Sequence, residues 1–368
     1  MVEMSVSWAA DERGPAKVVF LRLCAGVDAV VVVDNVALGP AIGGVRMRPG
    51  VTAGEVARLA RAMTVKNAVA GLAHGGGKAG IVAPPGSPDD HERVMRAFAR
   101  AIGQLTDYIP GPDMGTSETS MAYVQDEIGR AVGLPAVLGG VSLDELGATG
   151  FGLAVCAQIL SEAQVLDLAG ARVVVQGFGA VGSHAARLLA GRGAVVTAVS
   201  DSRGAVSNPD GLDVPALVAH KRGGEPVAGF SGGTALPRDD VLGLDCEILV
   251  PAAQPDVVTA GNAGKISARV VLEGANIPVT REAEAELAGR GVLCVPDVVA
   301  NAGGVICGAA EYSGAGRAGA FAAIEEKIRD STAELLDRIR DGVLLPRAAA
   351  EQMAQERIGK ALALRRKF

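Results

Sequence analysis

The chain has 368 residues with 50 glycines, five cysteines and a formal net charge of −6, and 49% of its residues are hydrophobic. The length predicts about two or three domains, and the negative charge excludes a basic surface for nucleic acid or anionic lipid. The longest nearly apolar run, Val298–Ala310, is too short for a membrane helix. With no export signal and no CxxC pair that would indicate a metal site, these features predict a cytoplasmic α/β enzyme without membrane, metal or nucleic acid.

The first third of the chain alternates strand-like and helical patterns. The β-branched runs Val18–Leu23 and Ala29–Val33 are typical of strands. Thr52 and Glu55 have the spacing of a capping box, which predicts a helix that ends near Ala70. These elements indicate a compact α/β unit.

The following stretch is rich in glycine and proline. Gly71–Gly80 is a glycine-rich segment that leads to a strand stub at Ile81 and Val82, and Pro88 opens a second helix. Tyr108–Gly115 is predicted as a loop, because its two prolines and two glycines exclude regular structure.

Beyond a connecting helix at Gly147–Leu160, β-type runs alternate with helical stretches. The runs are Arg172–Gln176, Ala194–Ser200, Cys246–Pro251, Arg269–Glu273 and Val292–Val295. Such alternation indicates a parallel, doubly wound sheet. We expect a substrate-binding domain over residues 1–142, a Rossmann domain over 143–330, and C-terminal helices over 331–368 that pack back on the first domain, with the reacting site in the cleft between the domains.

A GxGxxG motif joins the first of these strands to a helix; its residues are Gly177, Phe178, Gly179, Ala180, Val181 and Gly182. Its glycines allow a tight turn, close approach of a pyrophosphate, and close packing of helix on strand. Asp201, followed by Ser202, ends the next strand 19 residues after Gly182. There a carboxylate can accept from a ribose hydroxyl and would repel a 2′-phosphate. The motif predicts a site for NAD rather than NADP.

Three polar residues of the first domain are candidates for the reacting site. Lys78 stands among small residues that let a ligand approach and leave its ammonium partly desolvated, which lowers a lysine pKa toward neutrality. Lys66 lies in a mostly apolar helical stretch and so is expected to point into a cleft. Asp113 lies in a tight loop, where a turn aspartate is an equally good interpretation from local features.

Over nearly its whole length the chain resembles the glutamate/leucine/phenylalanine/valine dehydrogenases. The matching motifs are Gly39–Met47, Lys66-Asn67, Leu72–Lys78, Ala148–Gly150, Gly177–Gly182, Pro251–Ala253, Glu273–Asn276, Pro296-Asp297 and Asn301–Val305. The resemblance implies an N-terminal α/β substrate and oligomerisation domain and a Rossmann domain. It also implies reversible oxidative deamination of an L-amino acid to a 2-oxo acid and ammonia, with hydride passing to a nicotinamide, in a homo-oligomer.

The resemblance also implies roles for single residues. Lys66 would hold the substrate α-carboxylate, Lys78 would activate water and stabilise charge on the carbinolamine, and Asp113 would exchange protons with the amino group. Further substrate contacts would come from Gly43 and Gly44. Cofactor contacts would come from Thr149 at the nicotinamide carboxamide, Ala252, Asn276 at the ribose region and Asn301 at the junction with the substrate.

Two departures from the family pattern bear on the substrate. Ile42 stands where glutamate-specific members carry a lysine for the side-chain carboxylate, and Gly308 stands where they carry a serine. A substrate carboxylate buried without a partner is strongly unfavourable. Together with Val305 and Gly111, these residues suggest an apolar and rather roomy pocket for Leu, Val, Ile or Phe.

Two alternatives remain open. Ser200–Gly204 and Asn208–Leu212 are closer to the glutamate-type cofactor domain, so a glutamate dehydrogenase with a rearranged carboxylate site is one. The other is a catalytically silent NADH-binding regulatory protein, against which the joint presence of Lys66, Lys78 and Asp113 argues.

Overall fold

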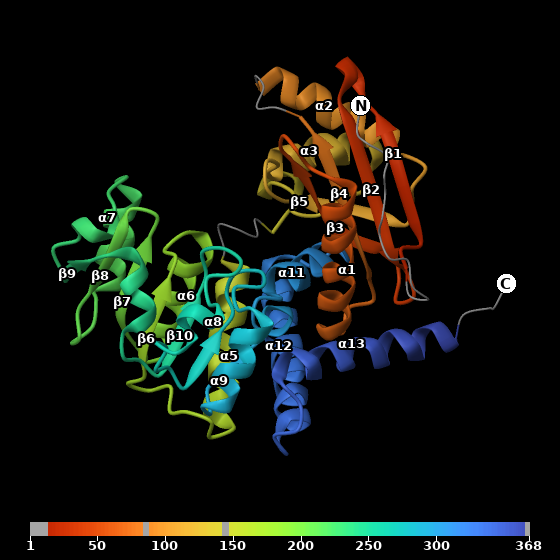
Figure 1. The fold of residues 1–368 in the computed structure, drawn as a ribbon. Helices are drawn as coiled ribbons and strands as arrows, with labels where there is room; N and C mark the ends of the chain where they lie inside the picture. The colour runs from red at the N-terminus through yellow and green to blue at the C-terminus, as the bar shows by residue number, and fades with distance from the viewer. Residues whose placement is uncertain (1–13, 84–87, 142–146, 365–368) are drawn as a thin grey trace. The chain divides into compact units, whose positions relative to one another are not determined.

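The computed structural model describes residues 14–83, 88–141 and 147–364 (Figure 1). The chain forms two compact units. One comprises residues 1–143, 305–323 and 351–368, and the other residues 144–304 and 324–350. The expected boundary between residues 142 and 143 lies outside the described residues. The C-terminal helices α12 (Arg317–Ile339) and α13 (Pro346–Ala363) are each shared between the units, whereas we expected one C-terminal block.

The first unit is built on a five-stranded sheet with the order β1-β2-β4-β3-β5. The strands are β1 (Lys17–Arg22), β2 (Asp28–Asn35), β3 (Ala41–Met47), β4 (Gly75–Val82) and β5 (Tyr108–Pro112). β1, β2 and β4 are antiparallel neighbours, whereas β3 runs parallel to both β4 and β5. The predicted strands at Val18–Leu23 and Ala29–Val33 are confirmed.

The two faces of this sheet have different coverings. Val31 and Val33 of β2 belong to a core with α2 (Pro88–Ala101) and α3 (Glu118–Ile128), as do Val45 and Ala79. Val30 and Val32 instead pack with α1 (Ala53–Val69). Because successive side chains of a strand point to opposite faces, Lys78 on β4 and Ile42, Gly44 and Arg46 on β3 lie on the α1 face.

Two sequence expectations for this sheet are wrong. Tyr108–Pro112 is a strand rather than a loop, because β5 is an edge strand whose one neighbour among the described strands is β3. The carbonyl of Pro110 points outward and accepts from the Val132 N–H at 2.9 Å, so the prolines lack a donor only on the unpaired side. The strand stub at Ile81 is the end of the eight-residue β4, whose glycines let α1 approach: a Cβ on Gly76 would lie 2.0 Å from the Thr64 nitrogen.

The second unit contains a seven-stranded sheet with the order β12-β11-β10-β6-β7-β8-β9. The predicted parallel strands are confirmed as β6 (Arg172–Gln176), β7 (Val195–Asp201), β10 (Ile248–Pro251), β11 (Val270–Leu272) and β12 (Leu293–Val295). The antiparallel β8 (Gly204–Ser207) and β9 (Thr234–Leu236) extend one edge and were not predicted. The helices are α5 (Ala148–Glu162), α6 (Ala180–Ala190), α7 (Val214–Arg222), α8 (Ala260–Ala263), α9 (Arg281–Gly289) and α10 (Asp297–Ala300). α11 (Gly303–Tyr312) begins in this unit, but its residues from Val305 onward belong to the first.

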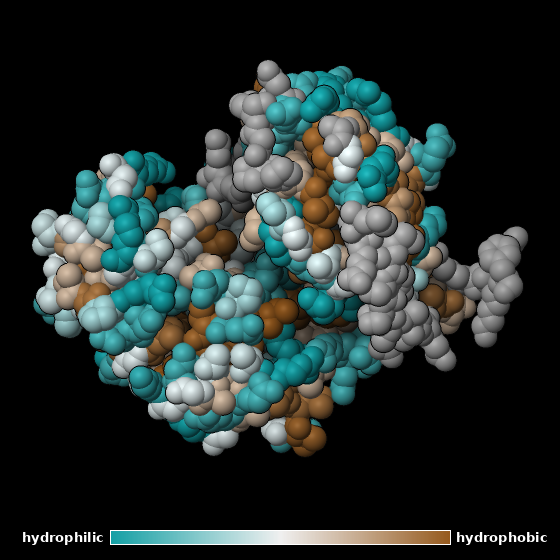
Figure 2. All heavy atoms as spheres, turned by 45° about the horizontal axis from the view of Figure 1, so that its top comes forward, coloured by the Kyte–Doolittle hydropathy of each residue, from teal (hydrophilic) through white to brown (hydrophobic). Residues whose placement is uncertain are grey.

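The face of the molecule in Figure 2 mixes hydrophilic residues with small apolar areas. Within the described ranges, no helix is both long and apolar enough to cross a bilayer.

Candidate active site

The centre of the candidate site is an ion pair between Lys78 and Asp113. Lys78 Nζ lies 3.0 Å from Asp113 Oδ2, and both side chains are largely buried. Burial lowers the pKa of Lys78, and the neighbouring Asp113 offsets only part of that effect. Burial alone would raise the pKa of Asp113, but Lys78 and Arg46 hold it below its usual value. The pair therefore joins a carboxylate that stays ionised to an amine that releases its proton more readily than a solvated lysine.

Glycine makes this pair possible. A Cβ on Gly44 would lie 2.8 Å from Asp113 Cβ and 3.1 Å from Lys78 Nζ, and a Cβ on Gly43 would lie 1.6 Å from the Gly77 carbonyl oxygen. Beneath them the buried Tyr108 hydroxyl donates to the Gly43 carbonyl at 2.8 Å. Bare backbone at Gly43 and Gly44 thus lets the lysine and the aspartate meet across β3.

Arg46 lies in the Gly39–Met47 motif and is a site residue that was not predicted from the sequence. Its Nε donates to Asp113 Oδ2 at 2.9 Å and its Nη1 to Glu55 Oε1 at 2.8 Å. Arg48 binds the other oxygen of Glu55 at 2.7 Å. Arg46 stands two residues after Gly44 in the sequence. Once β3 is recognised as a strand, this spacing puts Arg46 and Gly44 on the same face of the sheet. Of the predicted capping box, the half in which Thr52 accepts from the Glu55 N–H is present at 3.2 Å. The Glu55 side chain pairs with Arg46 and Arg48 instead.

Lys66 is buried in the last turn of α1, the helix that covers this face. Next to it, Asn67 Nδ2 donates to the Gly75 carbonyl at 2.6 Å and so fixes the end of α1 on the start of β4. Arg357 of α13 donates to the carbonyls of Ala68 and Val69 at the same helix end. These contacts hold Lys66 on the sheet face that also carries Lys78.

The predicted apolar residues surround the same face. Ile42 is buried on β3, and Gly111 on β5 is paired in register with Gly44. On α11, Gly308 is buried and Val305 half-buried. A Cβ on Gly111 would lie 3.0 Å from Val132 Cγ2, and one on Gly308 would lie 3.5 Å from the same atom. The structure thus brings Gly111 and Gly308 together through Val132, a residue that was not predicted from the sequence.

In the second unit, the glycine motif has the geometry that a dinucleotide phosphate requires. Gly177 has a φ of +98°, and a Cβ on Gly182 would lie 1.8 Å from the Gly177 carbonyl oxygen. No atom of the described residues lies within 4 Å of the Cβ position of Gly179, the N-cap of α6, and Gly179 and Ala180 are exposed. Phe178 is instead buried, and its N–H donates to the Ser200 carbonyl at 2.6 Å. Open N–H groups at a helix N-terminus fit a pyrophosphate.

Asp201 lies at the end of β7 as predicted, but its carboxylate is already bound by protein groups. Lys221 and the Val227 N–H, the latter at 3.1 Å, donate to Oδ2, and the Arg203 N–H donates to Oδ1 at 2.8 Å. Burial would raise the pKa of Asp201, yet Lys221 and the backbone donors keep it low. Its negative charge is therefore offset, and this weakens the argument that Asp201 repels a 2′-phosphate. Ser202 beside it is exposed.

Of the other expected cofactor residues, Ala252 and Asn276 follow the carboxyl ends of β10 and β11, Asn301 follows α10 after β12, and Thr149 lies in the first turn of α5. The Ala252 N–H donates to the Gln176 carbonyl at 2.7 Å. Asn301 Nδ2 donates to the Gly274 carbonyl at 3.0 Å and to Asn276 Oδ1 at 3.4 Å. A Cβ on Gly304 would lie 3.3 Å from Thr149 Oγ1. Ligands of open α/β sheets bind at this edge, so the residues fit a nicotinamide dinucleotide.

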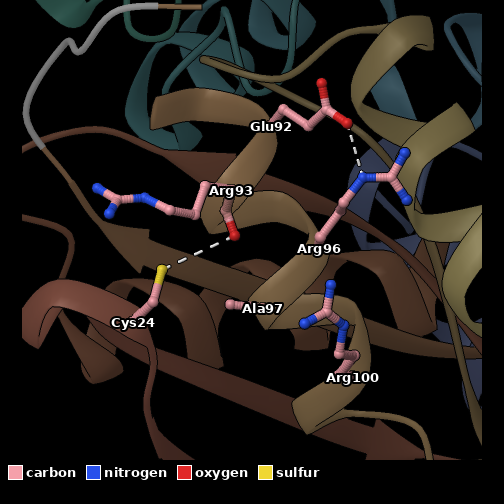
Figure 3. A pocket seen from close by; sticks show the side chains of 6 residues that line it. All are labelled: Cys24, Glu92, Arg93, Arg96, Ala97 and Arg100. Carbon is pink, nitrogen blue, oxygen red and sulfur yellow. Dashed lines mark hydrogen bonds and ion pairs between the residues drawn. The ribbon is translucent and has the colours of Figure 1, made fainter. Parts of the chain in front are cut away.

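A separate surface pocket of about 450 Å³ lies on α2 (Figure 3). Cys24, Glu92, Arg93, Arg96, Ala97 and Arg100 line it. Arg96 pairs with Glu92, Asp126 and Glu127, and Arg100 pairs with Glu127. Because α2 covers the face opposite Lys78 and acids offset these arginines, the pocket is no part of the candidate site. The described residues contain no group of three or more His, Cys, Asp or Glu that could hold a metal ion.

Comparison with known proteins agrees with this combination of a lysine–aspartate pair and a dinucleotide fold. A family model described as Glutamate/Leucine/Phenylalanine/Valine dehydrogenase matches residues 139–366, and one described as Glu/Leu/Phe/Val dehydrogenase, dimerisation domain, matches residues 20–130. The chain therefore belongs to the glutamate/leucine/phenylalanine/valine dehydrogenase family. It is an amino acid dehydrogenase that carries out oxidative deamination with a pyridine nucleotide.

Three similar proteins are informative. Glutamate dehydrogenase of Aeropyrum pernix is 38% identical over 356 residues, which are 90% of this chain and 85% of that protein. Catabolic NAD-specific glutamate dehydrogenase RocG of Bacillus subtilis is 40% identical over 285 residues, 74% of this chain and 67% of that protein. The structure of hetero-hexameric glutamate dehydrogenase from Thermus thermophilus in a leucine-bound form has a TM-score of 0.85 and 33% identity, covering 96% of this chain and 91% of that one.

Proposed function

We propose that this chain catalyses the NAD-dependent oxidative deamination of an L-amino acid with an apolar side chain, of the Leu, Val, Ile or Phe type. The observation that carries the proposal is Ile42, buried on the face that bears Lys78, at the position where glutamate-specific members carry a lysine. The arginines of this region are already engaged, since Arg46 and Arg48 pair with Glu55 and Asp113. The side-chain carboxylate of a glutamate substrate would therefore lack a charged partner there.

In this proposal each polar residue has a distinct task. Lys66 binds the α-carboxylate, Lys78 in its neutral form takes a proton from the attacking water, and Asp113 exchanges protons with the amino group. Charged Lys78 then stabilises negative charge on the carbinolamine oxygen. The residues Gly177–Gly182, Asp201, Ser202, Thr149, Ala252, Asn276 and Asn301 would hold NAD, which would supply the hydride acceptor.

The name of the NAD-specific Bacillus relative favours NAD over NADP. The Asp201 carboxylate at the end of β7 adds only part of its charge to this preference, because Lys221 pairs with it. The match to a dimerisation domain favours assembly of at least two copies of this chain, and the Thermus relative is a hetero-hexamer. The five cysteines are unpaired, which suits the reducing cytoplasm.

Glutamate is the second candidate substrate, because the curated relatives are named for it. The Thermus relative, whose structure was solved in a leucine-bound form, is likewise named a glutamate dehydrogenase. Turnover of leucine, valine, isoleucine, phenylalanine and glutamate by the purified protein, with NAD and with NADP, decides between them. We expect kcat/KM for the best apolar amino acid to exceed that for glutamate at least about tenfold, and preference for glutamate would overturn the proposal. NADH binding without turnover of any amino acid would instead indicate a regulatory protein.

A further inference from the structure

The position of Val132 adds a feature that the substrate residues alone do not show. Gly111 pairs in register with Gly44, so both glycines face the side of the sheet that carries Lys78. On that side Val132 Cγ2 lies 3.0 Å from the place a Cβ of Gly111 would occupy, and 3.5 Å from that of Gly308. One valine side chain therefore fills the space left by two glycines from separate elements.

Val132 is held firmly in this place. Its N–H donates to the Pro110 carbonyl of β5 at 2.9 Å, and its side chain is buried. The flanking loop is bound to α11, because Glu311 accepts from the Leu134 N–H at 3.0 Å and from the Val141 N–H at 2.9 Å. A β-branched side chain on a backbone fixed from two sides has little rotamer freedom. Val132 thus forms a rigid wall between β5 and α11.

We infer that Val132 is a specificity-determining residue that sets the upper size limit of the substrate side chain. This inference rests on the proposed function and makes it narrower. The glycines at 111 and 308 suggested a roomy pocket, but the Val132 side chain occupies the space beside both of them. Of the apolar amino acids, the branched aliphatic ones fit better than phenylalanine.

The test is the ratio of kcat/KM for phenylalanine to that for valine in wild type, Val132→Ala and Val132→Ile. One methylene in an apolar pocket changes discrimination at least about tenfold. We therefore expect Val132→Ala to raise the ratio about tenfold or more and Val132→Ile to lower it. The matched control is Val124→Ala, which truncates a buried valine of α3 on the opposite face of the sheet. It should leave the ratio unchanged even if stability falls.

A ratio that is the same in wild type, Val132→Ala and Val132→Ile overturns the inference. Wild-type preference for glutamate overturns the proposed function instead. In that case the test compares kcat/KM for glutamate with kcat/KM for the shorter aspartate. A higher glutamate-to-aspartate ratio in Val132→Ala than in wild type supports the role of Val132, and an unchanged ratio contradicts it. Circular dichroism of each variant shows whether the fold is retained.

Discussion

Lys78 Nζ and Arg46 Nε both lie within 3.0 Å of a single oxygen atom, Oδ2 of Asp113. Two cations on one carboxylate keep Asp113 ionised, and Arg46 adds to the burial that lowers the pKa of Lys78. Arg46 is itself held by Glu55 on α1. The acid–base pair is thus positioned by an ion-pair chain that begins on the helix covering the sheet.

Lys78→Ala should abolish turnover while leaving NADH binding nearly intact. Asp113 keeps Arg46 as a partner, so the variant leaves no unpaired buried carboxylate. Loss of a general acid–base group typically costs about 10²–10⁴-fold in rate. Steady-state kinetics and NADH fluorescence titration measure the two effects, with Lys17→Ala at an exposed ion pair as the control. Wild-type activity in Lys78→Ala would remove this lysine from the mechanism.

Arg46→Met should move the pH profile in a defined direction. The Arg46 charge lowers the pKa of both Lys78 and Asp113, so its removal raises both. The limb of kcat/KM that rises as Lys78 loses its proton should therefore shift to higher pH, by roughly one unit or less. Arg46→Lys keeps the charge and should restore most of the profile. A rate loss with no shift of this limb would mean that Arg46 has only a structural role.

Features of this structure that depend on residues close together in the sequence can be predicted from it, and features that depend on residues far apart in the sequence cannot. The glycine motif, β6 and the α1 N-cap at Thr52 depend on neighbouring residues and were predicted correctly. The strand β5 was not, because its prolines are tolerated only at a sheet edge, and edge position is a property of the assembled sheet. The contact of Arg46 with Asp113 and that of Val132 with Gly111 also depend on strand register.

Ile42→Lys combined with Gly308→Ser should raise glutamate activity. The new lysine and hydroxyl would offer a side-chain carboxylate the charged partner and hydrogen bond that it lacks. Serine at 308 is tolerated because its Cβ meets Val132 at an ordinary 3.5 Å. We expect the glutamate-to-leucine ratio of kcat/KM to rise about tenfold or more, and Ile42→Met with Gly308→Ser serves as the uncharged control. Equal ratios in the two double variants would show that position 42 does not face the substrate side chain.

Asp201→Asn should increase the use of NADP relative to NAD. The amide keeps an acceptor for the Arg203 N–H and removes the negative charge, so Lys221 is left to attract a 2′-phosphate. Lys221→Met should do the opposite, because it leaves the Asp201 charge without its cation. The measurement is the ratio of kcat/KM for NADP to that for NAD. We expect this ratio to rise several-fold in Asp201→Asn and to fall several-fold in Lys221→Met. Shifts of the same sign in both would contradict this account of the pair.

Glu273→Gln should make the stability of the second unit less dependent on pH. Arg347 Nη2 lies 2.5 Å from Glu273 Oε2, while Nη1 of the same guanidinium binds Asp297 at 2.9 Å. Burial of this carboxyl and the neighbouring charge of Asp297 raise its pKa to about 8 from an ordinary 4.5, and Arg347 offsets only part of that rise. The folded state therefore keeps a proton that the unfolded state has released, and wild-type stability falls as the pH rises between these values.

The glutamine carries no charge in either state, so its melting temperature should lack this decline. Thermal unfolding from pH 5 to pH 9 should show Glu273→Gln gaining several degrees on wild type as the pH rises, with the gain levelling off near pH 8. Parallel melting curves over the whole range would mean that Glu273 is ionised in the folded protein and that Arg347 neutralises it fully.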